Sequence, residues 1–180
     1  MPANRQTLNR DQKASEILDV AEQMFMDGGF DGTTIAALAR RAGVAGNTVY
    51  WYFPSKDDLL AAILTRRLDR VLAAVPGDVT MSEAATAALA ALDEFAPLTA
   101  VVHERARRSP AVADAHERFH HQVDHAIRDA FERSGLSRDD ARSAARAIVA
   151  MVEGIHLHDP LRDPQARNAL VRWVLHRLAP

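Results

Sequence analysis

The chain has 180 residues, of which 48% are hydrophobic, and its formal net charge is −2. This length suits one medium domain or two small ones around a real hydrophobic core. The absence of cysteine excludes disulfides and thiolate metal sites, and no apolar run has the length of a signal peptide core or a membrane span. We therefore expect a cytoplasmic protein that makes no membrane contact and binds no cofactor or metal.

The near-neutral charge excludes nucleic-acid binding that relies on a large basic surplus. Residues 1–56 hold six Lys or Arg side chains and six Asp or Glu side chains. Because neutralisation of phosphates drives much of the affinity of many DNA-binding proteins, any DNA contact made by this segment has to come from donors placed locally.

Three helices are predicted in the first part of the chain. The apolar residues of 11–27 recur at helical spacing and stop at Gly28-Gly29, which indicates a first helix with a glycine cap. A short helix over 35–41 follows two threonines, either of which is a suitable N-cap. A turn at Gly43-Val44 then leads into another short helix over about 45–52.

A fourth, long helix begins at Ser55, which forms a capping box with Asp58, and it ends near Pro76-Gly77. This end is the predicted boundary between two domains. The expected organisation is a small helical domain over 1–55, a connecting helix over 55–75 and a second helical domain over 76–180.

The second domain shows the same kinds of helix-capping and helix-breaking residues. A helix is expected to open at Thr80 and to end or kink at Pro97. Three more helices are expected over 110–134, 138–158 and 164–178, each preceded by a Ser or Asp that can cap it. With no strand pattern along the sequence, the predicted fold class is all-α.

The segment from Ile35 to Phe53 has the spacing of a helix-turn-helix. Ala39 leaves room where the second short helix crosses the first, Gly43 tolerates the turn, and Val49 locks the second helix inward. The spacing also fits an ordinary corner between two helices that binds no DNA, since these residue types are common.

Four consecutive aromatic residues, Tyr50 to Phe53, close this segment. Helical geometry directs Val49 and Phe53 to the same, inward face, so Tyr50 and Trp51 have to point elsewhere. An exposed phenol beside a recognition helix is suited to donate a hydrogen bond to a phosphate. For Trp51, exposure to DNA and packing against neighbouring helices both remain open.

Residues 29–60, GFDGTTIAALARRAGVAGNTVYWYFPSKDDLL, closely resemble the N-terminal domain of the tetracycline-repressor (TetR) family. The resemblance covers residues 11–60, and beyond residue 75 it rests on helix layout and length alone. The matching positions are Gly29-Phe30, Thr33-Thr34, Ile35-Ala36, Ala39, Ala42-Gly43-Val44, Thr48-Val49-Tyr50, Phe53, Lys56 and Leu59-Leu60.

The resemblance implies a homodimer that places two recognition helices in successive major grooves of a near-palindromic double-stranded DNA operator. It also implies repression of transcription, relieved when a small-molecule effector binds the second domain. Activation instead of repression remains open, because the sign of regulation depends on operator position.

The resemblance assigns the DNA contacts residue by residue. Thr33, Thr34, Thr48, Tyr50 and Lys56 match positions that contact the DNA backbone. The base-facing positions are Ala45, Gly46 and Asn47, and of these only Asn47 has a side chain that can read a base edge, such as that of adenine. Ala45 stands where serine is common and Tyr52 where histidine is usual, so more of the readout is expected from Asn47, Trp51 and DNA shape.

The helix after Pro110 carries an apolar stripe that includes Phe119, with His116 in the stripe and His120 at its edge. We expect these three residues, with Phe95 and His103, to line the effector pocket. His116 to His120 also reads HExxH, which leaves a zinc-dependent hydrolase as an alternative function. No Gly-x-x-His extension follows the motif, and the sheet that such hydrolases use is not predicted.

The last two helices carry the predicted dimer interface. Their apolar residues spread over more surface than one subunit needs for its own core, and the family resemblance places the intersubunit helix bundle here. The alternative is that Trp173 closes the core of its own subunit. The predicted interface residues are Ile148, Met151, Val152, Ile155, Leu170, Trp173 and Val174.

Taken together, the sequence predicts a DNA-binding transcriptional regulator without catalytic residues. Besides the hydrolase, a second alternative is a DNA-binding protein that responds to no effector.

Overall fold

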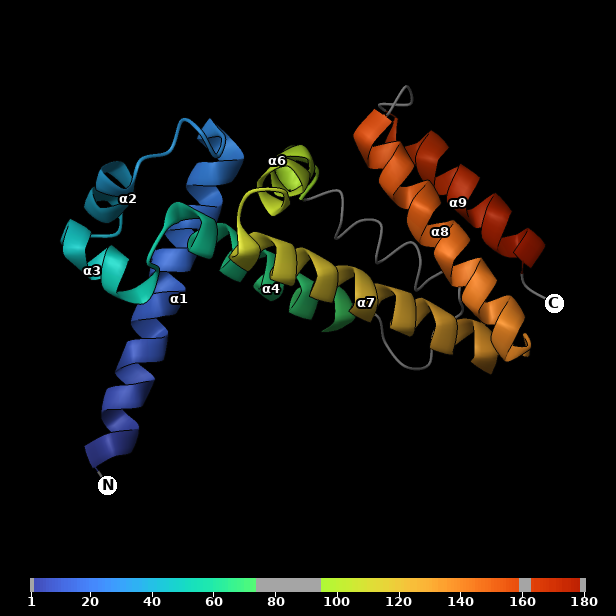
Figure 1. The fold of residues 1–180 in the computed structure, drawn as a ribbon, viewed down its shortest axis with the longest axis horizontal. Helices are drawn as coiled ribbons and strands as arrows, with labels where there is room; N and C mark the ends of the chain where they lie inside the picture. Colours follow the sequence, from blue (N-terminus) through green and yellow to red (C-terminus); the bar gives the residue numbers. More distant parts are fainter. Residues whose placement is uncertain (1, 74–94, 159–162, 179–180) are drawn as a thin grey trace. The chain divides into compact units, whose positions relative to one another are not determined.

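The computed structural model of the protein describes residues 2–73, 95–158 and 163–178. Every regular element in these ranges is an α-helix, which confirms the predicted fold class (Figure 1). None of the described helices is both long and apolar enough to cross a membrane. In chain order the helices are α1 (Pro2–Gly28), α2 (Ile35–Arg41), α3 (Gly46–Tyr52), α4 (Lys56–Ala73), α6 (Ala96–Ala106), α7 (Pro110–Arg133), α8 (Arg138–His158) and α9 (Pro164–Leu178).

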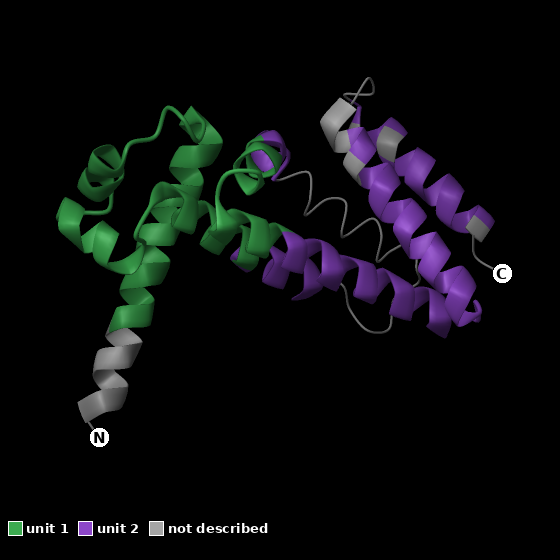
Figure 2. Cartoon of the chain, viewed as in Figure 1, with its two compact units in different colours: residues 1–65, 101–116 green, residues 66–100, 117–180 purple. Residues whose placement is uncertain are grey.

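The chain divides into two compact units, which Figure 2 colours separately. The first comprises residues 1–65 and 101–116, and the second comprises residues 66–100 and 117–180. The division falls inside α4, α6 and α7, whereas the sequence places a domain boundary at Pro76-Gly77, which lies outside the described residues. The predicted domain limits therefore stay a prediction.

The core of the first unit is built on one stripe of α1. Ile17, Ala21 and Phe25 recur every four residues, and none of the three is exposed to solvent. The ring of Phe25 meets the ring of Phe30 edge to face, with centroids 5.1 Å apart. Full burial of a side chain of this size contributes about 1.5–3 kcal/mol, so this stripe holds α1 against the rest of the unit.

Helix starts and stops mostly fall where the capping residues predict them. Ser55 and Asp58 form the expected box before α4, with the Asp58 N–H donating to the Ser55 hydroxyl oxygen at 3.2 Å. Ser137 caps α8 in the same way, and the Asp163 carboxylate accepts from the Gln165 N–H at the start of α9. Gly135 takes a φ of 102° after α7, a conformation that glycine adopts without strain.

Two helix predictions are wrong. Helix α1 starts at Pro2 instead of Asp11, because residues 3–10 contain no helix breaker and proline fits the first helical position. Pro97 does not end a helix but stands in the first turn of α6. An N–H in the first turn has no acceptor within its helix, so proline loses nothing there. The helix expected from Thr80 lies outside the described residues.

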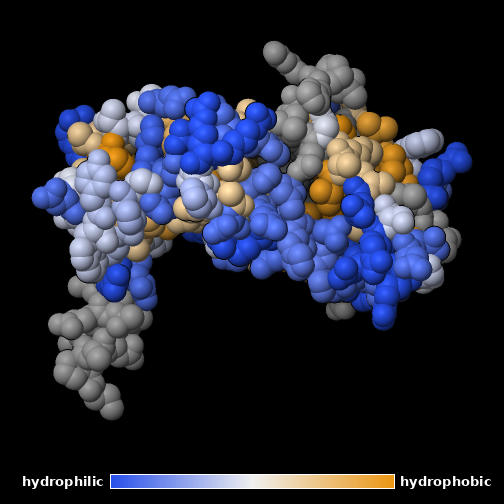
Figure 3. All heavy atoms as spheres, in the orientation of Figure 1, coloured by the Kyte–Doolittle hydropathy of each residue, from blue (hydrophilic) through white to orange (hydrophobic). Residues whose placement is uncertain are grey.

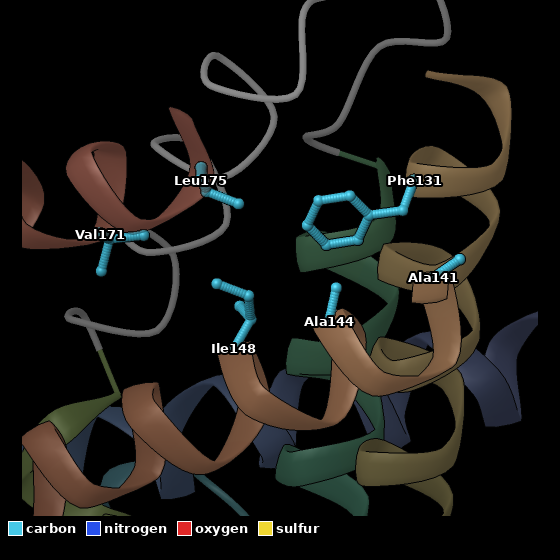
Figure 4. Packing of buried hydrophobic residues seen from close by; sticks show 6 residues of the cluster. All are labelled: Phe131, Ala141, Ala144, Ile148, Val171 and Leu175. Carbon is cyan, nitrogen blue, oxygen red and sulfur yellow. The ribbon is translucent and has the colours of Figure 1, made fainter. Parts of the chain in front are cut away.

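The second unit has its own apolar cluster, formed by side chains of helices α7, α8 and α9. Figure 4 shows the ring of Phe131 from α7 directed into the space between α8 and α9. Small residues of α8 let the helices approach at this point. The buried members of the cluster are Phe131, Ala141, Ala144, Ile148, Val171 and Leu175.

Candidate nucleic-acid interface

The two threonines before α2 have different roles. Thr34 is exposed and is the N-cap, because its hydroxyl oxygen accepts from the Ala37 N–H at 3.1 Å. Thr33 is buried, and its hydroxyl lies 2.9 Å from the Gly29 carbonyl and 3.2 Å from the Met24 carbonyl. The predicted DNA contact therefore suits Thr34, whereas the Thr33 side chain fixes the end of α1 to the loop that follows.

The turn between α2 and α3 has the predicted form. Gly43 adopts a φ of 66°, which a residue with a side chain reaches only with strain. The Val44 N–H donates to the Ala39 carbonyl at 3.0 Å, so the chain reverses directly after α2. Ala39 is buried where the two helices meet, as the helix-turn-helix spacing predicts.

Helix α3 has one inward and one outward face. Val49 and Phe53 are buried, which confirms the inward pair. Asn47 is exposed, and Tyr50 and Trp51 expose 52% and 61% of their surface. Residues at these three positions share one side of a helix, because they are three and four residues apart. The open question about Trp51 is thus decided in favour of exposure.

The first residues of α3 carry little side chain. Ala45 is the N-cap in an extended conformation and makes no side-chain hydrogen bond. A Cβ atom added at Gly46 would find no atom within 4 Å, so the outward face is open to an approaching surface at this point. Thr48 and Tyr52 are half-buried at the sides of this face.

Lys56, expected to contact a phosphate, also binds within the protein. Its ammonium donates to the carbonyls of Phe30 and Thr33 at 2.7 and 3.1 Å and lies 4.2 Å from the centroid of the Phe30 ring. These bonds use two of its three N–H donors. Lys56 therefore holds the loop before α2 in place, and a phosphate contact is left with one donor.

An ion pair that no sequence pattern indicates joins α6 to the start of α4. Arg105 donates to both carboxylate oxygens of Asp57, at 2.9 and 2.5 Å, and its guanidinium lies 5.6 Å from the Phe30 ring centroid. The hydrogen bonds to Asp57 raise the pKa of Arg105 above its ordinary value. The two residues are 48 positions apart in the sequence, so no local pattern predicts their contact.

The predicted pocket residues fall in both compact units. The rings of His103 on α6 and His116 on α7 are in edge-to-face contact, with centroids 4.6 Å apart. Phe119 meets its neighbour His120 with centroids 5.8 Å apart, and Phe95 is buried beneath the guanidinium of Arg67. His103 and His116 belong to the first unit and the other three residues to the second, so a shared pocket stays a prediction.

The HExxH alternative gains no support. A catalytic zinc site needs three protein ligands. Within the described residues, no group of three His, Cys, Asp or Glu side chains could hold a metal ion.

The predicted dimer residues differ in how much surface they offer. Ile148 is buried in the cluster of its own unit, so it has little area for a partner, and Met151, Val152, Ile155 and Val174 pack partly against that cluster. Leu170 and Trp173 on α9 expose 38% and 59% of their surface. Trp173 therefore does not close the core of its own subunit. Figure 3 shows hydrophobic residues gathered over α8 and α9.

Two short helices joined by a glycine turn, the second with an exposed polar and aromatic face, define a helix-turn-helix protein. Residues 17–63 match the family described as bacterial regulatory proteins of the tetR family. Residues 72–158 match the C-terminal domain of LmrA/YxaF-like transcriptional regulators. The chain belongs to the TetR family of DNA-binding transcriptional regulators.

Individual relatives agree with this assignment. The transcriptional repressor KstR of Rhodococcus jostii (strain RHA1) is 38% identical over 60 residues, which are 33% of this chain and 28% of that protein. The transcriptional activator FasR of Mycolicibacterium smegmatis is 34% identical over 68 residues, 38% of this chain and 31% of that protein. These alignments span less than a third of either relative.

A solved structure matches over nearly the whole chain. It is a transcriptional regulator from Rhodococcus sp. Rha1, with a TM-score of 0.77 at 21% sequence identity. The superposition covers 92% of this chain and 95% of that one. This similarity shows that the two proteins share a fold.

Proposed function

We propose that the protein is a dimeric repressor that binds a near-palindromic DNA operator and leaves it when a small molecule binds. The observation that carries the proposal is the outward face of α3, where Asn47, Tyr50 and Trp51 are exposed side by side. A helix with such a face fits the major groove, where base edges are read directly.

The proposal gives each residue of this face a distinct task. Asn47 is suited to a bidentate contact with adenine, since its amide offers a donor and an acceptor. Trp51 offers an apolar ring to thymine methyl groups. The phenol of Tyr50 and the hydroxyls of Thr34 and Thr48 donate to backbone phosphates, which fixes the register of the helix without reading sequence. Tyr52 and the remaining donor of Lys56 flank this set.

A second copy of the chain is the proposed partner of α8 and α9. Leu170 and Trp173 leave apolar surface exposed on α9, and Arg177 covers the Trp173 ring from one side at 5.3 Å. Exposed apolar surface of this kind marks an interface. A two-fold dimer would place two recognition helices on two half-sites, which accounts for a near-palindromic operator.

Release by an effector is proposed from the composition of the predicted pocket. The contact between His103 and His116 offers imidazole donors and acceptors. Phe95, Phe119 and His120 belong to the second unit and stay predicted pocket residues. An effector lowers operator affinity only if it binds the conformation that fits DNA less well. Relatives include both a repressor and an activator, so family membership alone does not set the sign of regulation.

The test begins with a selection from random double-stranded DNA, followed by fluorescence anisotropy on the selected site and on a scrambled one. Tyr50→Phe should weaken binding to both DNAs alike, whereas Asn47→Ala should lose about 1–3 kcal/mol of discrimination at one base pair per half-site. Failure of the wild-type protein to select any sequence would refute the DNA-binding proposal.

The dimer and the effector need separate measurements. Sedimentation of the wild-type protein should give a dimer, and Trp173→Glu should shift it toward the monomer without loss of helical circular dichroism. A monomeric wild-type protein would contradict the two-fold model. A small-molecule screen on the bound operator should yield compounds that lower the anisotropy, and a screen without hits would favour the effector-blind alternative.

A further inference from the structure

The core stripe of α1 continues beyond the core to Arg10. Arg10 precedes Ile17 by seven residues and Ala21 by eleven, so it lies on the same side of the helix as those buried residues. Arg10 itself is exposed. A long cationic side chain at the edge of an apolar stripe covers the last apolar surface with its stem and places its charge in water.

At this end of the stripe, Arg10 meets Trp51 of the recognition helix. The Arg10 guanidinium carbon lies 4.6 Å from the centroid of the Trp51 ring, within the distance of a cation–π contact. Tyr52 meets the same indole edge to face, with centroids 4.6 Å apart. Trp51 thus contacts two side chains although most of its surface is exposed, and its contact with Arg10 joins α1 to α3.

The charge of this contact matters because α3 has no cation of its own. Residues 42–55, which include the turn and the whole of α3, contain no Lys or Arg. The ammonium of Lys56 is bound by two carbonyls. Apart from its stacking on Trp51, Arg10 forms no hydrogen bond or ion pair with the side chains that the structure describes, and it is exposed.

We propose that Arg10 binds a backbone phosphate of duplex DNA beside the recognition helix, with Trp51 as the platform that holds its guanidinium. This inference rests on the proposed function and adds a residue outside the helix-turn-helix to the DNA contact. A guanidinium that stacks on a ring keeps its N–H groups for a bidentate bond to a phosphate, which a lysine ammonium cannot match. The same contact fixes the angle at which Trp51 meets the groove.

The test measures affinity for the selected operator by anisotropy between about 50 and 200 mM KCl. Each phosphate contact makes the negative slope of log K against log salt steeper by about 0.9. Arg10→Gln should therefore reduce the slope by about 0.9 for each Arg10 bound, or about 1.8 for a two-fold dimer. Arg10→Lys should keep most of the slope, since it keeps the charge.

Arg107→Gln is the matched control, because it removes one exposed positive charge from the same unit without touching α3. It should leave the slope unchanged, and a slope change equal to that of Arg10→Gln would reduce the effect to net charge and overturn the inference. Thermal unfolding of each variant, followed by circular dichroism, checks that the fold is retained.

The platform role is tested by a double-mutant cycle with Trp51→Ala. The affinity lost through Arg10→Gln should be about threefold smaller in the Trp51→Ala background, because the guanidinium is then no longer held. Additive losses would overturn the platform role. If the wild-type protein selects an operator but Arg10→Gln matches it in affinity and slope, the inference fails and the proposed function stands; if no operator is selected, both fail.

Discussion

The ion pair between Arg105 and Asp57 provides a quantitative test of how the first unit is held together. Arg105→Leu removes both hydrogen bonds to the carboxylate but keeps an apolar stem beside the Phe30 ring. The Asp57 side chain is only 16% exposed, so the carboxylate left behind is incompletely hydrated. We therefore expect a loss well above that of a surface ion pair.

The magnitude follows from burial and geometry. A hydrogen bond to a charged group contributes about 1.5–3 kcal/mol when it is shielded from water, whereas an exposed ion pair contributes about 0.2–1 kcal/mol. The Arg105 side chain is 29% exposed, which screens part of the interaction. The expected loss in unfolding free energy is about 2 kcal/mol for Arg105→Leu.

The assay has to report on the first unit alone, because the two units need not unfold together. The chain has two tryptophans, and only Trp51 lies in the first unit. A Trp173→Phe background therefore leaves Trp51 fluorescence as the probe of urea unfolding. With an m-value of about 1–2 kcal/mol per molar, a loss of about 2 kcal/mol lowers the urea midpoint by about 1–2 M.

Arg108→Leu is the matched control. Arg108 pairs with Glu104 at 3.1 Å, but both side chains are more than half exposed. Its removal should cost less than about 0.5 kcal/mol, as for exposed pairs one helical turn apart. The reasoning is refuted if Arg105→Leu costs no more than Arg108→Leu.

Three further predictions use the same unfolding assay. Gly32→Ala should lower the free energy of unfolding by about 1–3 kcal/mol, because the new Cβ would lie 2.5 Å from the Gly28 carbonyl oxygen. Gly28→Ala, whose new Cβ would have no atom within 4 Å, should be neutral or stabilising. Equal effects of the two changes would contradict this. Thr34→Ala should cost about 1 kcal/mol through loss of the α2 cap and Thr34→Ser should recover most of it, so an unchanged midpoint in Thr34→Ala would contradict the capping role. Gly46→Ala should stabilise the protein by about 0.5–1 kcal/mol, so a drop in DNA affinity would report the groove contact itself, and a destabilised variant would contradict the open space at this position.

Local sequence determined most helix limits and the central motif. The residues that start or stop a helix act on N–H and C=O groups within one turn, so Gly43, Ser55 and Ser137 could be read without knowledge of the fold. The inward pair of α3 follows from helical periodicity in the same way. For this reason the two short helices, their glycine turn and the inward pair were predictable from the chain alone, whereas the exposure of Trp51 was not.

Local sequence did not decide the structure where two residues, or two uses of one residue, were equally suitable. Two adjacent threonines precede α2, and only the packing of α1 against the loop showed that Thr33 is the buried one. Pro97 can end a helix or stand in its first turn, and nothing near it in sequence distinguishes these uses.

Tertiary structure decided every contact between residues far apart in the chain. Three contacts join segments whose separation in sequence carries no periodic signal. They are the bonds from Lys56 to the loop before α2, the pair of Arg105 with Asp57 and the stack of Arg10 on Trp51. Charged side chains are long and adopt many rotamers, so their partners are set by which helices the core brings together. The sequence therefore specifies the recognition helix, while tertiary contacts specify which partners Lys56, Arg105 and Arg10 have.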